Sequence, residues 1–123
     1  MSQTNHIDLT KDLATQFQTR ATEADKTSTL PSEDIAALKS SGYLALNIPK
    51  QYGGFGLSLR ACTEAQLELA QGSASTALVT AMQLQVFGAA RDCKTWTDET
   101  YERFCHASVK GALFNSVATE PEL

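Results

Sequence analysis

The sequence has 123 residues, of which 42% are hydrophobic, and its ten basic and fourteen acidic residues give a net charge of −4. This length and composition fit a single domain with a substantial core. An acidic balance supplies no basic patch of the kind that nucleic acids require, so we expect no nucleic-acid partner. The opening stretch MSQTNHIDLTKDL also lacks the apolar core of a signal peptide.

The cysteines and the longest uncharged segment bear on the cellular compartment of the protein and on whether it crosses a membrane. Cys62, Cys93 and Cys105 are odd in number and far apart in sequence, which disfavours a disulfide framework or a zinc site. We therefore expect free thiols in a reducing compartment, and a cytoplasmic protein. Residues 69–90 carry no formal charge, but their Gln, Ser and Thr content favours a buried helix of a soluble bundle over a membrane span.

Two helices are predicted in the first third of the chain. The first covers about residues 8–26, because apolar residues recur at four-residue spacing from Leu9 to Phe17. The second begins near Pro31, a residue suited to the first helical position, and is followed by acidic residues in its first turn. Gly42 can supply the left-handed conformation that ends this helix.

The glycine-rich stretch 47-NIPKQYGGFGLS-58 is predicted to be a connection between helices. Pro49 and the three glycines argue against a helix here. The glycines match neither the dinucleotide-binding GxGxxG pattern nor the Gly-Lys-Ser/Thr ending of a P-loop, so a phosphate-binding loop is disfavoured. Tyr52 and Phe55 are candidates for side chains that hold the loop to the core.

Three further helices follow. We predict one over about residues 59–71, capped by Ser58, and a second over about 75–87 that leaves little polar surface and is therefore the most buried. The last covers about residues 97–110, with Thr97 as its cap and acidic residues in its first turn.

After Gly111 the pattern changes from helix to strand. Leu113, Phe114 and Val117 give the run 112–123 a strand-like composition. A lone strand has no partner, so we interpret it as the start of a sheet whose other strands are missing. The predicted fold is all-α, with about five helices in residues 1–111 and a terminal β-strand in 112–123.

The residues alone predict no self-contained catalytic site. His106 follows Cys105 directly, and adjacent positions do not share a helix face, so a Cys–His pair is disfavoured. His6 lies near the terminus, and nothing resembles a Ser-His-Asp arrangement or a metal cluster. Glu120 falls on the predicted strand, where a solvated carboxylate is the simpler interpretation.

Three stretches, taken in order, resemble the N-terminal part of the acyl-CoA dehydrogenase family. They are 31-PSEDIAALKSSGYLALNIPKQYGGFGLS-58, 73-SASTALVTAMQLQVFG-88 and 117-VATEP-121. The resemblance spans roughly Leu9 to Pro121. It implies an N-terminal helical domain, a central β-domain and a C-terminal four-helix bundle, with FAD between the last two. In that family the Tyr-Gly-Gly-x-Gly loop links helices and is not the flavin phosphate site.

The same resemblance implies an oxidoreductase that converts a saturated acyl-CoA or related thioester to its 2,3-enoyl form. The glutamate base and most flavin contacts would lie in segments beyond Leu123, so no catalytic residue is assigned in this chain. We expect the isolated chain to be inactive and not to retain FAD. The parent protein is expected to be a homo-oligomer, and its electron acceptor is left open.

A few positions correspond to family sites. Thr119 matches the threonine that approaches the flavin ring, and Ala118 lies in the adjacent backbone, so both are assigned to the cofactor together with Ser116. Ser116 stands where the dehydrogenases often have an aromatic residue, and this departure leaves open how the ring edge is covered. Gln83 and Phe87 match the region that lines the acyl pocket, although a core role for Phe87, and for Leu84 beside them, is an equal alternative.

Two other functions stay open from the sequence. The first is a flavin-dependent monooxygenase of the same fold, towards which Ser116 points slightly. The second is a non-catalytic helical interaction module, in which an unpaired strand edge would bind another chain.

Overall fold

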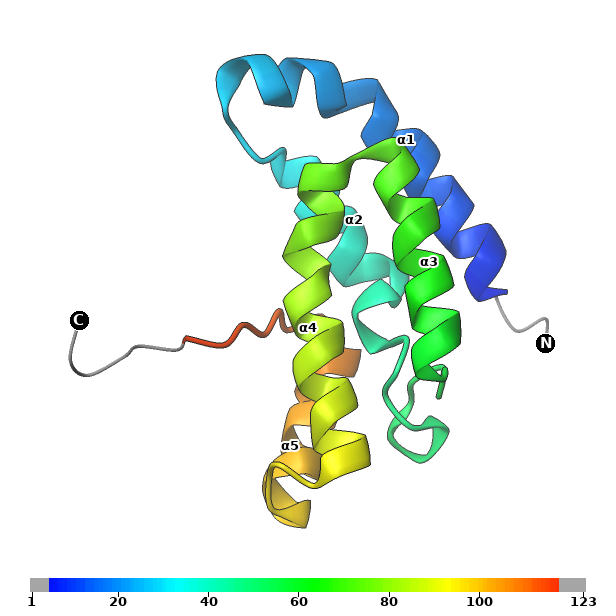
Figure 1. Ribbon diagram of the computed structural model, residues 1–123, viewed down its shortest axis with the longest axis vertical. Helices are drawn as coiled ribbons and strands as arrows, with labels where there is room; N and C mark the ends of the chain where they lie inside the picture. Colours follow the sequence, from blue (N-terminus) through cyan, green and yellow to red (C-terminus); the bar gives the residue numbers. More distant parts are fainter. Residues whose placement is uncertain (1–4, 118–123) are drawn as a thin grey trace.

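The computed structural model describes residues 5–117, and residues 1–4 and 118–123 lie outside the described part (Figure 1). The described chain is all-α, as predicted, with five α-helices and two short 3₁₀ turns. The helices are α1 (His6–Thr27), α2 (Ser32–Ser41), α3 (Leu59–Gly72), α4 (Ala74–Cys93) and α5 (Asp98–Val109), and the 3₁₀ turns are Tyr43–Ala45 and Lys50–Tyr52. In Figure 1, α3 lies beside α4, α1 runs along the other side of α3, and α5 lies against the lower half of α4.

The helix ends follow the local chemistry that the sequence predicted. The Ser58 hydroxyl accepts from the backbone N–H of Ala61 at 3.2 Å, and the Thr97 hydroxyl accepts from that of Thr100 at 3.3 Å. Both predicted caps are therefore confirmed. Pro31 occupies the cap position itself, one residue before the helix starts. Gly42, at φ +89°, takes the predicted left-handed conformation.

Helix α4 is longer than predicted, because it continues beyond Phe87 to Cys93. Gly88 does not end it: Gly88 is helical, and the site of its missing Cβ faces the Asn47 side chain at 3.5 Å, an ordinary contact distance. The helix ends instead at Lys94, whose φ is +55°. Seven of its residues are buried, more than in any other helix of the described chain, as the prediction of the most buried helix requires.

The glycine-rich stretch is the expected tight connection. Its backbone N–H groups from residue 53 to 57 all donate to backbone carbonyls between residues 45 and 50, so these donors are already used within the loop. Phe55 packs against the core formed by α1 to α4, and Tyr52 packs against the core beside α5. A Cβ on Gly54 would lie 2.1 Å from the carbonyl oxygen of Ile48, so only glycine fits this turn.

The predicted terminal strand is not seen over its described part. Residues 112–117 leave α5 as an irregular segment that runs out past α4 (Figure 1). A strand needs a hydrogen-bonding partner, and residues 5–117 provide none for it. The remainder of the predicted strand, 118–123, lies outside the described residues.

Candidate functional site

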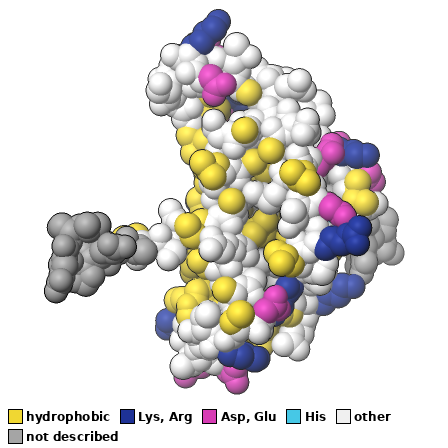
Figure 2. Space-filling view, viewed as in Figure 1, with side chains coloured by type: hydrophobic (Ala, Val, Ile, Leu, Met, Phe, Trp, Pro, Cys, Tyr) yellow, Lys and Arg dark blue, Asp and Glu magenta, His cyan; other side chains and the backbone are white. Residues whose placement is uncertain are grey.

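The outer face of α4 carries apolar side chains that the domain does not cover. Leu78 is 74% exposed, and Val79, Ala81 and Met82 are half-buried. In Figure 2, hydrophobic side chains gather over α4, whereas Lys, Arg, Asp and Glu lie at the ends and along the right-hand edge. This apolar face is the candidate surface for binding a ligand or another protein segment.

The inner face of the same helix is mixed, because it buries polar side chains beside the apolar Ala77, Leu84, Phe87 and Ala90. Thr76, Thr80 and Gln83 are fully buried. Each is satisfied by protein partners: the Thr76 hydroxyl donates to Asp34 at 2.8 Å, and that of Thr80 lies 2.7 Å from the side-chain oxygen of Gln66. Helix α4 therefore buries hydrogen-bonded polar groups together with part of its apolar surface, and leaves Leu78 and Met82 on its outer side.

Two adjoining hollows lie between α4 and the segment that follows α5. The first has a volume of about 430 Å³ and is lined on the helix side by Leu78, Met82 and Gln85. The second has a volume of about 560 Å³, and its walls include Trp96 and Ser116. Their shared border is formed by residues 114–115. Both hollows are open to solvent rather than enclosed.

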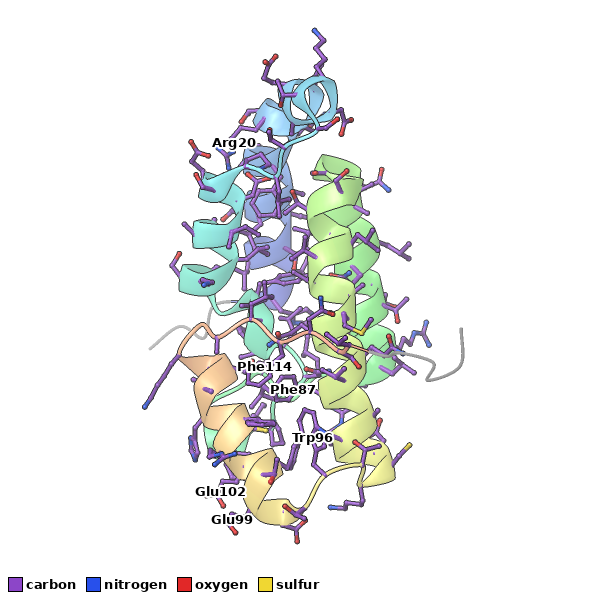
Figure 3. The ribbon with its side chains drawn as sticks, turned by 90° about the vertical axis from the view of Figure 1, so that its left-hand side faces the viewer. Arg20, Phe87, Trp96, Glu99, Glu102 and Phe114 are labelled. Atoms are coloured by element: carbon purple, nitrogen blue, oxygen red, sulfur yellow. The ribbon has the colours of Figure 1, made fainter. Side chains whose placement is uncertain are left out.

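An aromatic cluster forms the floor between the hollows and the core. The ring centroid of Phe114 lies 5.0 Å from that of Phe87 and 5.1 Å from that of Phe104. Trp96 packs edge-on against Phe87 and against Phe104. Figure 3 shows Phe87, Trp96 and Phe114 gathered between α4 and α5. Edge-to-face packing of this kind fixes ring positions more firmly than area burial alone.

The sequence-assigned residues lie at different depths. Gln83 and Phe87 have no exposed surface and do not line either hollow, and the nearly buried Leu84 borders a different hollow, between α3 and α4. Ser116 is exposed at the rim of the second hollow, where its backbone N–H donates to the Asn115 side chain at 2.8 Å. The assignments to Ala118 and Thr119 fall outside the described residues.

The residues that face the hollows on α4 are ones the sequence interpretation did not select. Leu78, Ala81, Met82 and Gln85 recur at spacings of three and four, which places them on one helical face. Buried Thr76, Thr80 and Gln83 form a second stripe on the opposite side. The sequence contains both stripes at helical spacing. Identifying the outer one from the sequence would have required the assumption that Thr76, Thr80 and Gln83 face the core.

A third hollow of about 420 Å³ lies between α3 and α4. Cys62 borders it, and burial raises the pKa of that thiol above its ordinary value, which favours the protonated form. Asn47 also borders it and donates through Nδ2 to the Leu84 carbonyl at 2.7 Å, whereas its Oδ1 has no partner. Arg91 also borders it and donates to the Leu57 carbonyl at 2.7 Å.

Residues 5–117 lack two features that would point to other kinds of site. No group of three or more His, Cys, Asp or Glu side chains is arranged to hold a metal ion. None of the helices in this part of the chain has the length and apolar character needed to cross a membrane.

Comparison with known proteins places this helical domain. Residues 6–111 match the family described as acyl-CoA dehydrogenase, N-terminal domain. The chain is 34% identical over 108 residues to "Putative acyl-CoA dehydrogenase YdbM" of Bacillus subtilis, which covers 88% of this chain and 28% of that protein. It is 28% identical over 115 residues to "3-(aryl)acrylate reductase" of Clostridium sporogenes, covering 92% of this chain and 30% of the relative.

The chain is also similar, over a shorter stretch, to mycobacterial proteins. "Probable acyl-CoA dehydrogenase FadE25" of Mycobacterium tuberculosis is 39% identical over 62 residues, or 50% of this chain and 16% of that protein. The chain thus spans less than a third of the length of these relatives. It belongs to the acyl-CoA dehydrogenase family and corresponds to the N-terminal helical domain of that family.

Proposed function

We propose that this chain is the N-terminal domain of a flavin-dependent oxidoreductase that introduces a 2,3-double bond into an acyl-CoA or related thioester, and that α4 forms one wall of its acyl pocket. The observation that carries the proposal is the uncharged outer face of α4, where Leu78 and Met82 border a hollow of about 430 Å³. The family match over residues 6–111 supports the reaction class.

In this proposal the domain contributes by excluding water from the pocket and by orienting the acyl chain. An aliphatic wall takes an acyl chain out of water at a gain of about 0.8 kcal/mol for each buried CH₂. It also keeps water away from the reacting carbons. No described residue next to the hollows is placed to act as a strong base, so the base is assigned to the C-terminal part of the parent protein.

FAD would accept the hydride that leaves the β-carbon. The described residues fit only the border of such a site: Ser116 lies exposed at the rim of the hollow beside Trp96. We assign Ser116, together with Ala118 and Thr119 beyond the described part, to contacts with the ring. Residues 1–111 would then be the helical domain and 112–123 the entry into a β-domain that supplies the remaining contacts.

Gln83 and Phe87 take a supporting part in this proposal. Both have no exposed surface, so we assign them to the layer directly beneath the acyl pocket, where they hold the wall in place. The parent is proposed to be cytoplasmic, which the free thiols of the chain support. We also propose that it is a homo-oligomer, which rests on the family resemblance alone. Its electron acceptor is left unassigned.

Turnover by the full-length parent tests the reaction. We expect FAD to copurify with it, and a dye to be reduced when a saturated acyl-CoA is added. The isolated 123-residue chain should do neither. Stoichiometric FAD binding and dye reduction by the isolated chain would show that the proposed division of labour between domains is wrong.

A pair of variants tests the wall. Leu78→Trp should raise KM for longer acyl chains more than for short ones, because the indole fills part of the hollow. Leu67→Trp on α3 is the matched control, since Leu67 is also an exposed leucine, at 63%. If Leu78→Trp changed KM by the same factor for short and long acyl chains, as Leu67→Trp should, α4 would not form a wall of the acyl pocket.

The two alternatives give different outcomes in the same assays. A monooxygenase, which the serine at position 116 favours, would consume oxygen with reduced flavin and leave acyl-CoA unchanged. An interaction module would show no flavin and no turnover in the full-length protein.

A further inference from the structure

The buried amide of Gln83 is the meeting point of four separate parts of the chain. Its Nε2 donates to the Ser108 hydroxyl at 2.8 Å, and to the carbonyls of Leu44 and Ala112 at 3.4 Å each. Its Oε1 accepts from the backbone N–H of Phe114. One side chain on α4 therefore bonds to the first 3₁₀ turn, to α5 and to the segment that leaves α5.

All of the hydrogen-bonding capacity of this amide is directed at protein groups. Gln83 has no exposed surface, and both of its polar atoms have partners within the domain. The Ser108 hydroxyl donates onward to the Leu44 carbonyl at 2.9 Å, which fixes the amide orientation from a second side. An amide satisfied in this way has no free group with which to recognise a ligand.

The hydrogen bond from Phe114 to Gln83 marks where the exit segment is last held to the helical domain. Among the described residues it is the last one, towards the C-terminus, that joins the exit segment to another element. Beyond it, the only described bond is the local one from Ser116 to the Asn115 side chain. Side-chain packing also holds the exit segment to α4 at this residue, because the Phe114 ring lies against Phe87.

We infer that Gln83 is a positioning residue: its amide clamps residues 112–114 onto α4 and thereby sets where Ser116 and the residues after it leave the helical domain. The clamp holds the two walls of the adjoining hollows, α4 and segment 112–117, at a fixed separation. Its meaning for catalysis rests on the proposed function, in which the residues from Ser116 onward approach the flavin.

Amide hydrogen exchange on the 123-residue chain, followed by NMR, tests the clamp without flavin or substrate. Gln83→Leu keeps the volume and removes both bonds to the exit segment. We expect the protection of the Phe114 amide, relative to that of the α3 amides, to fall about tenfold or more, since a buried hydrogen bond is lost. Gln18→Leu is the matched control, because Gln18 is an exposed amide on α1, and it should leave Phe114 unchanged.

A conservative variant separates positioning from general core stability. In Gln83→Glu at pH 5, burial keeps the carboxyl protonated, and one oxygen still accepts from Phe114. We expect this variant to retain most of the protection that Gln83→Leu loses, and it also serves if Gln83→Leu does not fold. Unchanged Phe114 protection in Gln83→Leu, or an equal fall at every helical amide, would overturn the inference.

Failure of this test is distinct from failure of the proposed function. Exchange at Phe114 reports the clamp alone, whereas flavin content and acyl-CoA turnover of the parent report the reaction. A clamp that is absent would leave the wall formed by Leu78 and Met82 as argued. A parent without turnover would leave Gln83 as the residue that positions the exit segment.

Discussion

The Nε atom of Arg20 lies 2.7 Å from the Oδ1 atom of Asp34, and this contact joins α1 to α2. The two side chains differ in burial, since that of Asp34 is 1% exposed and that of Arg20 is 30% exposed. The second carboxylate oxygen of Asp34 accepts from the Thr76 hydroxyl of α4 at 2.8 Å. A single buried carboxylate therefore connects three helices.

We predict that removing the cation costs more than neutralising the acid. Arg20→Met leaves a buried carboxylate with one hydroxyl as its partner, and should lower the free energy of unfolding by about 2–3 kcal/mol. Asp34→Asn removes the charge as well as one bond, and its former partner Arg20 can reach water, so we expect a loss of about 1–2 kcal/mol. Urea denaturation measures both.

An exposed ion pair supplies the control. Arg60 and Glu64 lie 3.2 Å apart on α3, with side chains 89% and 65% exposed. Arg60→Met should change stability by no more than about 0.5 kcal/mol. If Arg20→Met cost as little as Arg60→Met, the buried network would not stabilise the helix arrangement as argued.

Two helical glycines should respond to alanine in opposite directions. A Cβ on Gly72 would lie 2.1 Å from the carbonyl oxygen of Ala14, because α1 and α3 cross there. Gly72→Ala should therefore cost about 3 kcal/mol or more, since one backbone must move. Gly88→Ala meets only the Asn47 amide at 3.5 Å, and should gain up to about 1 kcal/mol from helix propensity.

Thermal melts of the two glycine variants measure this contrast. Both changes add the same methyl group to a helix, so each variant is the control for the other. A Gly72→Ala protein as stable as the wild type would show that the backbones of α1 and α3 are further apart than this structure has them.

The sequence could predict features that depend on near neighbours. Ser58 and Thr97 cap their helices because each hydroxyl reaches an N–H three residues away, and this needs no tertiary information. The end of α4, by contrast, was misplaced. The predicted helix stopped at Phe87, before Gly88, but Gly88 is helical and α4 continues to Cys93, beyond what the local pattern indicated.

The candidate site was harder to predict, because α4 is apolar or small on most of its surface. Sequence periodicity identified the helix but not which side faces the core. That choice depends on partners such as Asp34 for Thr76 and Ser108 for Gln83, which lie 42 and 25 residues away. Gln83 and Phe87 were therefore selected, whereas Leu78 and Met82 border the hollow.

The three thiols should differ in reactivity. Cys93 is exposed, whereas Cys62 and Cys105 are buried, and burial raises the pKa of both buried thiols. At pH 8, a disulfide reagent such as dithionitrobenzoate should therefore label one thiol rapidly and the other two slowly. All three should react at once in guanidinium, and Cys93→Ser should lose the fast phase alone. Two fast thiols in the folded wild type would contradict the burial of Cys62 or Cys105.

Alkaline pH should destabilise the domain through two tyrosines. Burial raises the pKa of Tyr43 and of Tyr101 above the ordinary value. Because the folded pKa exceeds the unfolded value of about 10, this stabilisation is complete below pH 10 and is lost as the pH rises further. The free energy of unfolding should accordingly stay level up to about pH 9 and fall above pH 10.

Phenylalanine at each position separates the two tyrosines. The Tyr43 hydroxyl donates to Gln66 at 2.6 Å, whereas that of Tyr101 has no hydrogen-bond partner. Tyr43→Phe should cost about 1–2 kcal/mol at pH 7, because Gln66 loses a donor, and Tyr101→Phe should cost nothing or stabilise. Each variant should also flatten the alkaline fall, since one group that ionises only on unfolding is gone. Urea titrations at pH 7 and pH 10.5 measure both effects. An unchanged fall in both variants would mean that other groups cause it.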